Sequence, residues 1–304
     1  MTAAVLPGPA EDGFVRRLAR RPLALACAAV LALIALLALL APLFALWSGI
    51  DPTAVDLLQR FEPPSARHWL GTDDIGRDVL LRLLMGGRVS LFVGLTAALG
   101  AAVIGTAIGL MAGYWGGRAD AALMRLTDGV IALPLLPLLI VLAAVDLAKL
   151  GVPAEIAASE QASLYRIVAI IVLTGWTTVA RLVRGAVLSV RTRDYVLAAV
   201  GQGAGPWRIM GVHILPNVAA PIVVATTLSV GNVILTETVL SFLGLGIQPP
   251  LPSWGNMLTN AQELLTTAPW LAIWPGLLIF VTVIACNLLG DGLQDALDPR
   301  AAQG

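Results

Sequence analysis

A long uncharged run near the amino terminus constrains this chain more than any other feature. Residues 22–50 contain no Asp, Glu, Lys or Arg, and most of them are Leu or Ala. About 20 apolar residues are enough to cross the hydrocarbon core of a bilayer as an α-helix. A secretory signal peptide has an apolar run of only about 7 to 15 residues, so we expect a membrane anchor that is retained.

The composition extends this expectation to the whole chain. Hydrophobic residues make up 58% of the 304 residues and charged residues 12%, whereas a soluble domain is usually about half apolar and about a quarter charged. Five more apolar segments have the length of spanning helices: 89–115, 121–145, 167–188, 214–236 and 264–290. The sequence therefore predicts an all-α integral membrane protein with about six transmembrane helices.

Basic residues predict how the chain is oriented. Four arginines precede the first run, namely Arg16, Arg17, Arg20 and Arg21. Because cytoplasmic loops carry an excess of Lys and Arg, we expect segment 1–22 to be cytoplasmic. Alternating crossings place loop 48–88 outside and the segment 181–213 inside. Within the outer loop, residues 79–84 are expected to form a short interfacial helix. The expected organisation is segment 1–22, a first helix at 23–47, the outer loop 48–88, a helical core at 89–290 and a cytoplasmic tail at 291–304.

The charge, the cysteines and the single lysine limit what the chain can bind. The net charge is zero, so no general attraction for nucleic acid is expected. Cys27 and Cys286 lie in apolar segments, which suits packing better than a disulfide or a metal site. Lys149 follows Ala148, so the Gly-Lys-Ser or Gly-Lys-Thr of a phosphate-binding loop is missing. We expect this chain to carry no catalytic residue, metal or cofactor, and any ATP to bind elsewhere.

Three glycines favour close helix packing in the second predicted span. Gly105, Gly109 and Gly113 recur every four residues and therefore line one face of a helix. Small residues in this pattern let two helix backbones approach closely. The neighbour is either another helix of the same chain or another subunit.

Prolines and one acid interrupt other predicted spans. Pro134 and Pro137 in the third span and Pro221 in the fifth remove backbone donors, so they produce bends that serve a gate or irregular packing. Glu237 closes the fifth apolar run, where an ionisable residue is costly unless it is paired or hydrated. It either belongs to a gate or pathway with Ser241 and Phe242, or sits at the outer interface, capped by hydroxyls such as those of Thr238 and Ser241.

The most informative segment is a polar interruption at residues 191–217, RTRDYVLAAVGQGAGPWRIMGVHILPN, which we call the docking segment. Residues 196–200 are expected to form a short helix and residues 207–215 a second one. Three glycines and Pro206 between them permit a turn. A helix pair that projects into the cytoplasm fits a groove on a partner protein.

The docking segment resembles the EAA loop of ABC-importer permeases, which has an acid, two alanines, a glycine and a terminal Leu-Pro. Leu197 replaces the family's glutamate and Val200 its usual arginine, so any salt bridge that those residues make is missing; Asp194 or Arg193 is a candidate substitute. The resemblance implies a segment that couples to an ATPase. Its expected residues are Arg193, Asp194, Tyr195, Ala198, Ala199, Gly203, Trp207, Arg208, His213, Leu215 and Pro216.

Two further stretches narrow the resemblance. They are HWLGTDDIGRDVLLRLLMGGRVSLFVG at 68–94 and LTETVLSFLGLGIQPPLPSWGNML at 235–258, followed by the tail GDGLQDALDPR at 290–300. Together they resemble the C-type membrane subunit of dipeptide and oligopeptide permeases, a type that also includes nickel permeases.

The resemblance implies a set of partners in the bacterial inner membrane. They are a second homologous permease subunit, two cytoplasmic ABC ATPase subunits that bind ATP and Mg²⁺, and an extracytoplasmic substrate-binding protein. This multi-pass chain, with both termini cytoplasmic, would provide the substrate path by alternating access and would not itself hydrolyse ATP.

Other functions remain open at this point. Similar permeases carry nickel chelates, glutathione or other small solutes in place of peptides. A gradient-driven secondary transporter would need acids near the midplane, and only Glu237 and Asp128 qualify. A membrane-embedded hydrolase would need a histidine beside a nucleophile, yet His68 and His213 fall in predicted loops.

Overall fold

The computed structural model describes residues 14–145, 149, 151–157, 159, 161–259 and 264–297, and these residues form helices and loops without a strand. The expected segments 1–22 and 291–304 therefore lie partly outside the described residues, including Arg300. The all-α prediction is confirmed for the described residues. The helices are α1 (Phe14–Ala19), α2 (Pro22–Ser48), α3 (Val79–Trp115), α4 (Gly117–Ala132), α5 (Leu135–Ala143), α6 (Ala154–Ala157), α7 (Ala162–Val190), α8 (Asp194–Gly201), α9 (Pro206–Arg208), α10 (Leu215–Phe242) and α12 (Trp270–Leu297).

Five of these helices are long and apolar enough to span a membrane. They are α2, α3, α7, the continuous helix from Pro206 to Phe242 and α12. The third predicted span is broken, because α4 and α5 meet at an angle of 84°. Leu133 is extended at the break and Pro134 follows it, as expected because proline disfavours the helical conformation in the residue before it. Pro221, in contrast, lies inside α10 without ending it.

Several predicted boundaries were wrong. Helix α3 begins at Val79, so the expected separate interfacial helix at 79–84 is its first part. Asp78 caps this end by accepting a hydrogen bond from the backbone N–H of Leu81 at 2.8 Å. Residues 207–215 are likewise not a separate helix, because α9 runs through the π-helical turn Ile209–Ile214 directly into α10. Helix α10 continues past 236 to Phe242, and α12 begins at Trp270, not at 264.

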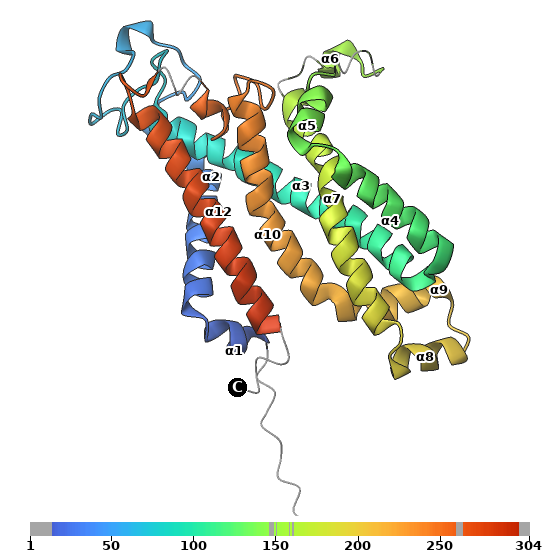
Figure 1. Ribbon diagram of the computed structural model, residues 1–304. Coiled ribbons are helices and arrows are strands. Elements are labelled where there is room, and N and C mark those ends of the chain that lie inside the picture. The colour runs from blue at the N-terminus through green and yellow to red at the C-terminus, as the bar shows by residue number, and fades with distance from the viewer. Residues whose placement is uncertain are drawn as a thin grey trace, which may run out of the picture.

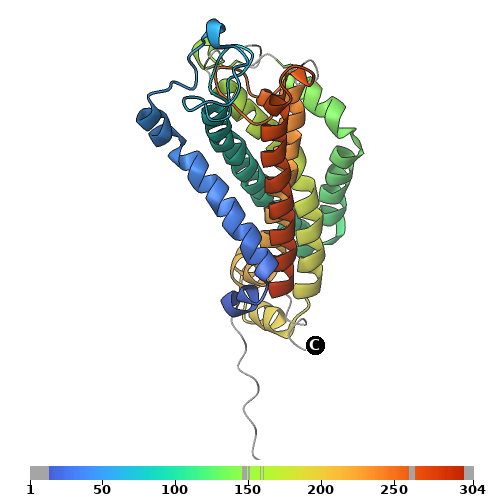
Figure 2. The ribbon, with the colours of Figure 1, turned by 90° about the vertical axis from the view of Figure 1, so that its left-hand side faces the viewer.

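The helices form a bundle with distinct ends. Helix α10 packs against α3, α7 and α12, and α2 packs against α3 and α12. Figure 1 shows α8 and α9 at the same end of the bundle as α1, while the loop between α2 and α3 lies at the opposite end. Figure 2 shows α2 slanting along the outside of the bundle. The docking segment and the outer loop are therefore separated by the length of the spanning helices.

The crossing of α3 and α7 depends on the three glycines. A Cβ atom added at Gly105 would lie 2.5 Å from the carbonyl oxygen of Trp176, and one at Gly109 would lie 2.6 Å from that of Ala180. At Gly113 it would meet Val187 at 2.7 Å. These glycines thus lie against α7 of the same chain, and only hydrogen fits at their Cα atoms.

Replacing Gly109 with alanine is expected to destabilise the bundle. The new methyl group would push α3 away from the backbone of α7, and overpacking of this kind costs about 1–3 kcal/mol. Gly185→Ala on α7 is the matched control, because a Cβ there meets nothing within 4 Å. Thermal unfolding of the detergent-solubilised chain should show a lower midpoint for G109A than for G185A, and equal midpoints would contradict this account of the crossing.

Candidate functional site

The docking segment begins where α7 ends, and its sequence accounts for its local structure. Asp194 opens α8, where a negative charge interacts favourably with the helix N-terminus. Gly203 follows α8 with φ of +80°, a conformation that glycine adopts without strain. Pro206 then occupies the first position of α9, where its missing N–H is not needed.

Helix α8 has one apolar face that packs and one that is exposed. Val196 and Ala199 are buried, and Val196 joins a cluster with Val183, Val187 and Ile209. Around the packed side, large apolar side chains of α8 remain open, with exposed fractions of 44% for Tyr195, 56% for Leu197 and 50% for Val200, and Trp207 of α9 is 68% exposed. Exposed apolar surface of this kind marks a contact with another protein or with a membrane.

Two contacts tie the docking segment to the end of α3. The guanidinium of Arg191 donates hydrogen bonds from Nη1 to the carbonyl oxygens of Gly113 at 2.9 Å and Tyr114 at 3.3 Å. The rings of Trp115 and Trp207 meet edge to face, with centroids 5.6 Å apart. The docking segment therefore contacts the end of α3 and is continuous with α10.

The other predicted docking residues are distributed around the segment. Arg193, Asp194, Ala198 and Arg208 are exposed, while His213, Leu215 and Pro216 lie at the junction with α10. Within the described part of the chain, neither Arg193 nor Asp194 joins an ion pair. The suggested internal substitute for the missing salt bridge therefore does not form, and the segment presents apolar side chains at positions 197 and 200.

Ion pairs join α4 to α7 near the docking segment, and the sequence interpretation missed them. Arg184 contacts Asp120 with Nη2 2.6 Å from Oδ2, and Arg181 contacts Asp128. The signal that could have identified them is the presence of opposite charges near the same predicted membrane boundary. Asp128 is held by an arginine, so it is a weak candidate for an ion-coupling acid.

Glu237 lies in a buried polar cluster at the other end of α10. It is fully buried, its Oε1 accepts a hydrogen bond from Ser241 at 2.7 Å, and its Oε2 accepts one from Ser90 at 3.4 Å. It therefore does not sit at an exposed interface. Of the two hydroxyls expected to cap it, Ser241 contacts it and Thr238 does not. Phe242 is partly exposed and lies outside the cluster. Of the three residues predicted to form a gate or pathway, Glu237 and Ser241 therefore lie together and Phe242 does not.

The same serines hold the loop that follows α10. Ser241 Oγ accepts a hydrogen bond from the backbone N–H of Ile247 at 3.1 Å, and Ser90 Oγ accepts one from Trp254 at 3.1 Å. The indole N–H of Trp254 donates to the carbonyl oxygen of Leu83 at 3.0 Å. Loop 244–259 is thus anchored between α3 and α10 through Glu237.

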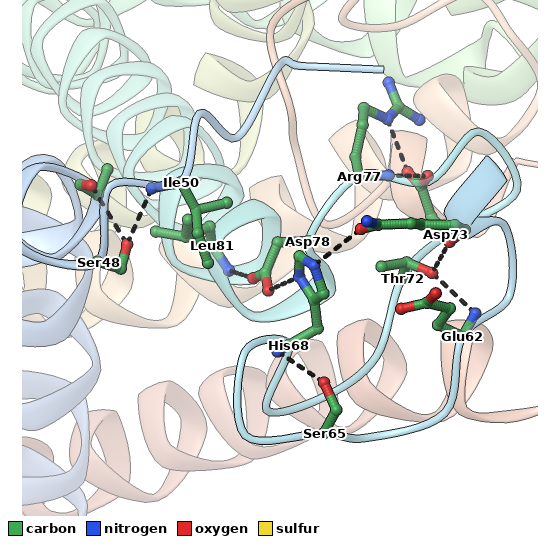
Figure 3. Close-up of polar contacts among 12 residues, drawn as sticks. Ser48, Ile50, Glu62, Ser65, His68, Thr72, Asp73, Arg77, Asp78 and Leu81 are labelled. Carbon is green, nitrogen blue, oxygen red and sulfur yellow. Dashed lines mark hydrogen bonds and ion pairs between the residues drawn. The ribbon is translucent and has the colours of Figure 1, made fainter. Parts of the chain in front are cut away.

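A second polar network orders the outer loop (Figure 3). One ring nitrogen of His68 lies 2.9 Å from Oδ2 of Asp78, and the other lies 3.2 Å from Oε1 of Gln59. Asp73 accepts a hydrogen bond from the side chain of Arg77 at 2.7 Å and lies 3.4 Å from Arg82. His68 therefore stabilises the entry into α3. Ser65 accepts a hydrogen bond only from the backbone N–H of His68, and among the described residues no serine hydroxyl bonds to the His68 ring as a nucleophile would.

Comparison with known proteins places this architecture in a family. The family model described as the inner membrane component of binding-protein-dependent transport systems matches residues 105–303, and a model of the N-terminal membrane domain of oligopeptide transport permease C matches residues 12–64. The chain is 40% identical over 255 residues to the oligopeptide transport system permease protein OppC of Bacillus subtilis, covering 84% of this chain and 79% of the relative. It is 40% identical over 286 residues to the dipeptide permease DppC of the same organism, covering 94% and 84%.

A third relative is the glutathione transport system permease protein GsiD of Pectobacterium atrosepticum, which is 45% identical over 239 residues, covering 79% of this chain and 75% of the relative. The family model spans more than half of the chain. With its apolar spanning helices and an exposed segment between α7 and α10, the chain belongs to the family of inner membrane components of binding-protein-dependent transport systems.

Proposed function

We propose that this chain is the permease subunit of an ATP-driven ABC importer for dipeptides and oligopeptides. The observation that carries the proposal is the exposed apolar surface of α8 and α9, because α9 is continuous with a spanning helix. Relatives named for oligopeptides, dipeptides and glutathione support the substrate class. These compounds share peptide linkages, so peptides are a better candidate than nickel or an unrelated solute.

The partners follow from this role. Two cytoplasmic ATPase subunits would bind ATP and Mg²⁺ and grip the docking segment, and a second homologous permease would complete the path. An extracytoplasmic binding protein would deliver the substrate at the end of the bundle that carries loop 48–88. The arginine cluster before α2 supports a bacterial inner membrane orientation with both termini in the cytoplasm.

The mechanism is alternating access driven from the docking segment. Closure of the ATPase pair would displace α8 and α9, and the continuous helix from Pro206 to Phe242 would carry the displacement across the membrane. Arg191 and Trp115 would pass the same movement to α3. Because α3 and α10 meet again at Glu237 and Ser90, both helices would move the anchored loop 244–259 as one unit. Nucleotide can shift this equilibrium only through different affinities for the two states.

Reconstitution tests the proposed function. Proteoliposomes containing this chain, its partner permease and the two ATPases should take up labelled trialanine when the binding protein and ATP are present. Omitting this chain or ATP should stop uptake, whereas a protonophore should leave the initial rate unchanged. Uptake by this chain alone, driven by a proton or sodium gradient, would instead identify a secondary transporter.

A further inference from the structure

One face of α10 is left open by the other described helices. Exposed residues Asn232, Leu235, Val239 and Phe242 follow one another at intervals of three or four positions, so they form a stripe along one side of the helix. Helices α3, α7 and α12 cover the other sides of α10. The stripe is apolar except for the carboxamide of Asn232.

The carboxamide of Asn232 is an exposed polar group of α10 that the helix itself does not satisfy. The hydroxyls of Thr226, Thr227, Ser229 and Thr236 each donate to the carbonyl four residues earlier, at 2.7–2.9 Å, and Ser241 donates to Glu237. Among the described residues, the Asn232 side chain makes no hydrogen bond. It lies ten residues before Phe242, or about 15 Å along the helix, inside the spanning segment. An unpaired amide is costly in hydrocarbon, so this face is not a lipid-facing one.

We propose that Asn232 lines the substrate path and hydrogen-bonds the backbone of the transported peptide; this inference rests on the proposed function. A carboxamide both donates and accepts, and so matches the N–H and C=O groups of a peptide unit. The neighbouring Leu235, Val239 and Phe242 provide apolar contact for side chains. An apolar lining with a few placed polar groups is typical of small-molecule sites, and backbone contacts suit peptides of different sequence.

The position of the stripe favours a moving contact with cargo over a fixed contact with the second permease. Asn232 belongs to the helix that begins at Pro206 inside the docking segment. Movement of α8 and α9 therefore moves Asn232. A hydrogen bond to cargo that forms in one state and breaks in the other permits release of the peptide. A fixed contact with the second permease would not need to change when the docking segment moves.

Thiol labelling in the assembled transporter tests the location. The background is the chain with Cys27→Ala and Cys286→Ala, both buried residues. Asn232→Cys should react with the membrane-impermeant reagent MTSES at least tenfold faster than Leu36→Cys, an exposed position on α2. Excess trialanine should slow the reaction, and trapping with ATP and vanadate should change its rate. A rate equal to that of L36C, or a cysteine that crosslinks to the second permease and is not protected by trialanine, would overturn the proposal.

Uptake kinetics test the role of the amide. Asn232→Leu should raise the apparent KM for trialanine at least tenfold in complexes that assemble normally, and Asn232→Gln should recover part of the loss. Unchanged KM in N232L would overturn the inference while wild-type ATP-dependent uptake still supported the proposed function. Failure of the wild-type complex to transport any peptide would overturn both.

Discussion

Replacing Val200 with aspartate is expected to abolish ATP-driven peptide uptake while the chain still inserts into the membrane. Val200 is half exposed on the open face of α8, so the substitution does not disturb the packed side formed by Val196 and Ala199. Covering the face with an ATPase would desolvate the new carboxylate, which costs several kcal/mol without a partner. A cost of about 3 kcal/mol corresponds to a more than 100-fold loss of affinity. Pull-down of the ATPases and uptake should fall together.

The control adds the same charge elsewhere on the cytoplasmic end. Gln294 is exposed on α12, far from α8 in the chain, and Gln294→Asp should leave pull-down and uptake close to wild type. Full uptake by V200D would mean that the open face of α8 does not meet the ATPase.

Replacing Glu237 with leucine is expected to cause the second large loss. The change would leave the hydroxyls of Ser241 and Ser90 without their shared acceptor in a fully buried site. Unsatisfied buried groups cost about 1–3 kcal/mol each, and the anchor of loop 244–259 would weaken. Thermal inactivation of the purified complex should begin at a clearly lower temperature, and external protease should cut the loop faster.

Glu237→Gln separates hydrogen bonding from side-chain size. Glutamine keeps an oxygen that accepts from Ser241, so E237Q should remain much closer to wild type than E237L. If the two variants lose equal stability, or if E237L loses none, Glu237 does not act as the anchor.

Much of the fold could be predicted because lipid imposes a simple rule on sequence. The apolar runs located the spanning helices, and Pro134 marked the break between α4 and α5. The start of α3 was missed because Arg82 argues against a span by hydropathy. Its position is explained by a contact with Asp73 that exists only after folding.

The docking segment could be located from its polarity and its resemblance to a known loop, but its attachments could not. Arg191 reaches Gly113 across 78 positions and Glu237 meets Ser90 across 147. No local pattern specifies such pairs. The four-residue spacing of Gly105, Gly109 and Gly113 predicted close packing, yet only the folded chain identifies α7 as the neighbour.

Labelling of Tyr195 tests the central claim, that the docking segment is cytoplasmic and covered by an ATPase. Tyr195→Cys, in the chain with Cys27→Ala and Cys286→Ala, places a thiol on the exposed face of α8. An impermeant maleimide should not label it in intact cells, should label it in inside-out vesicles stripped of ATPases, and should lose access when the ATPases are restored. Labelling in intact cells, or labelling that the ATPases leave unchanged, would contradict the account.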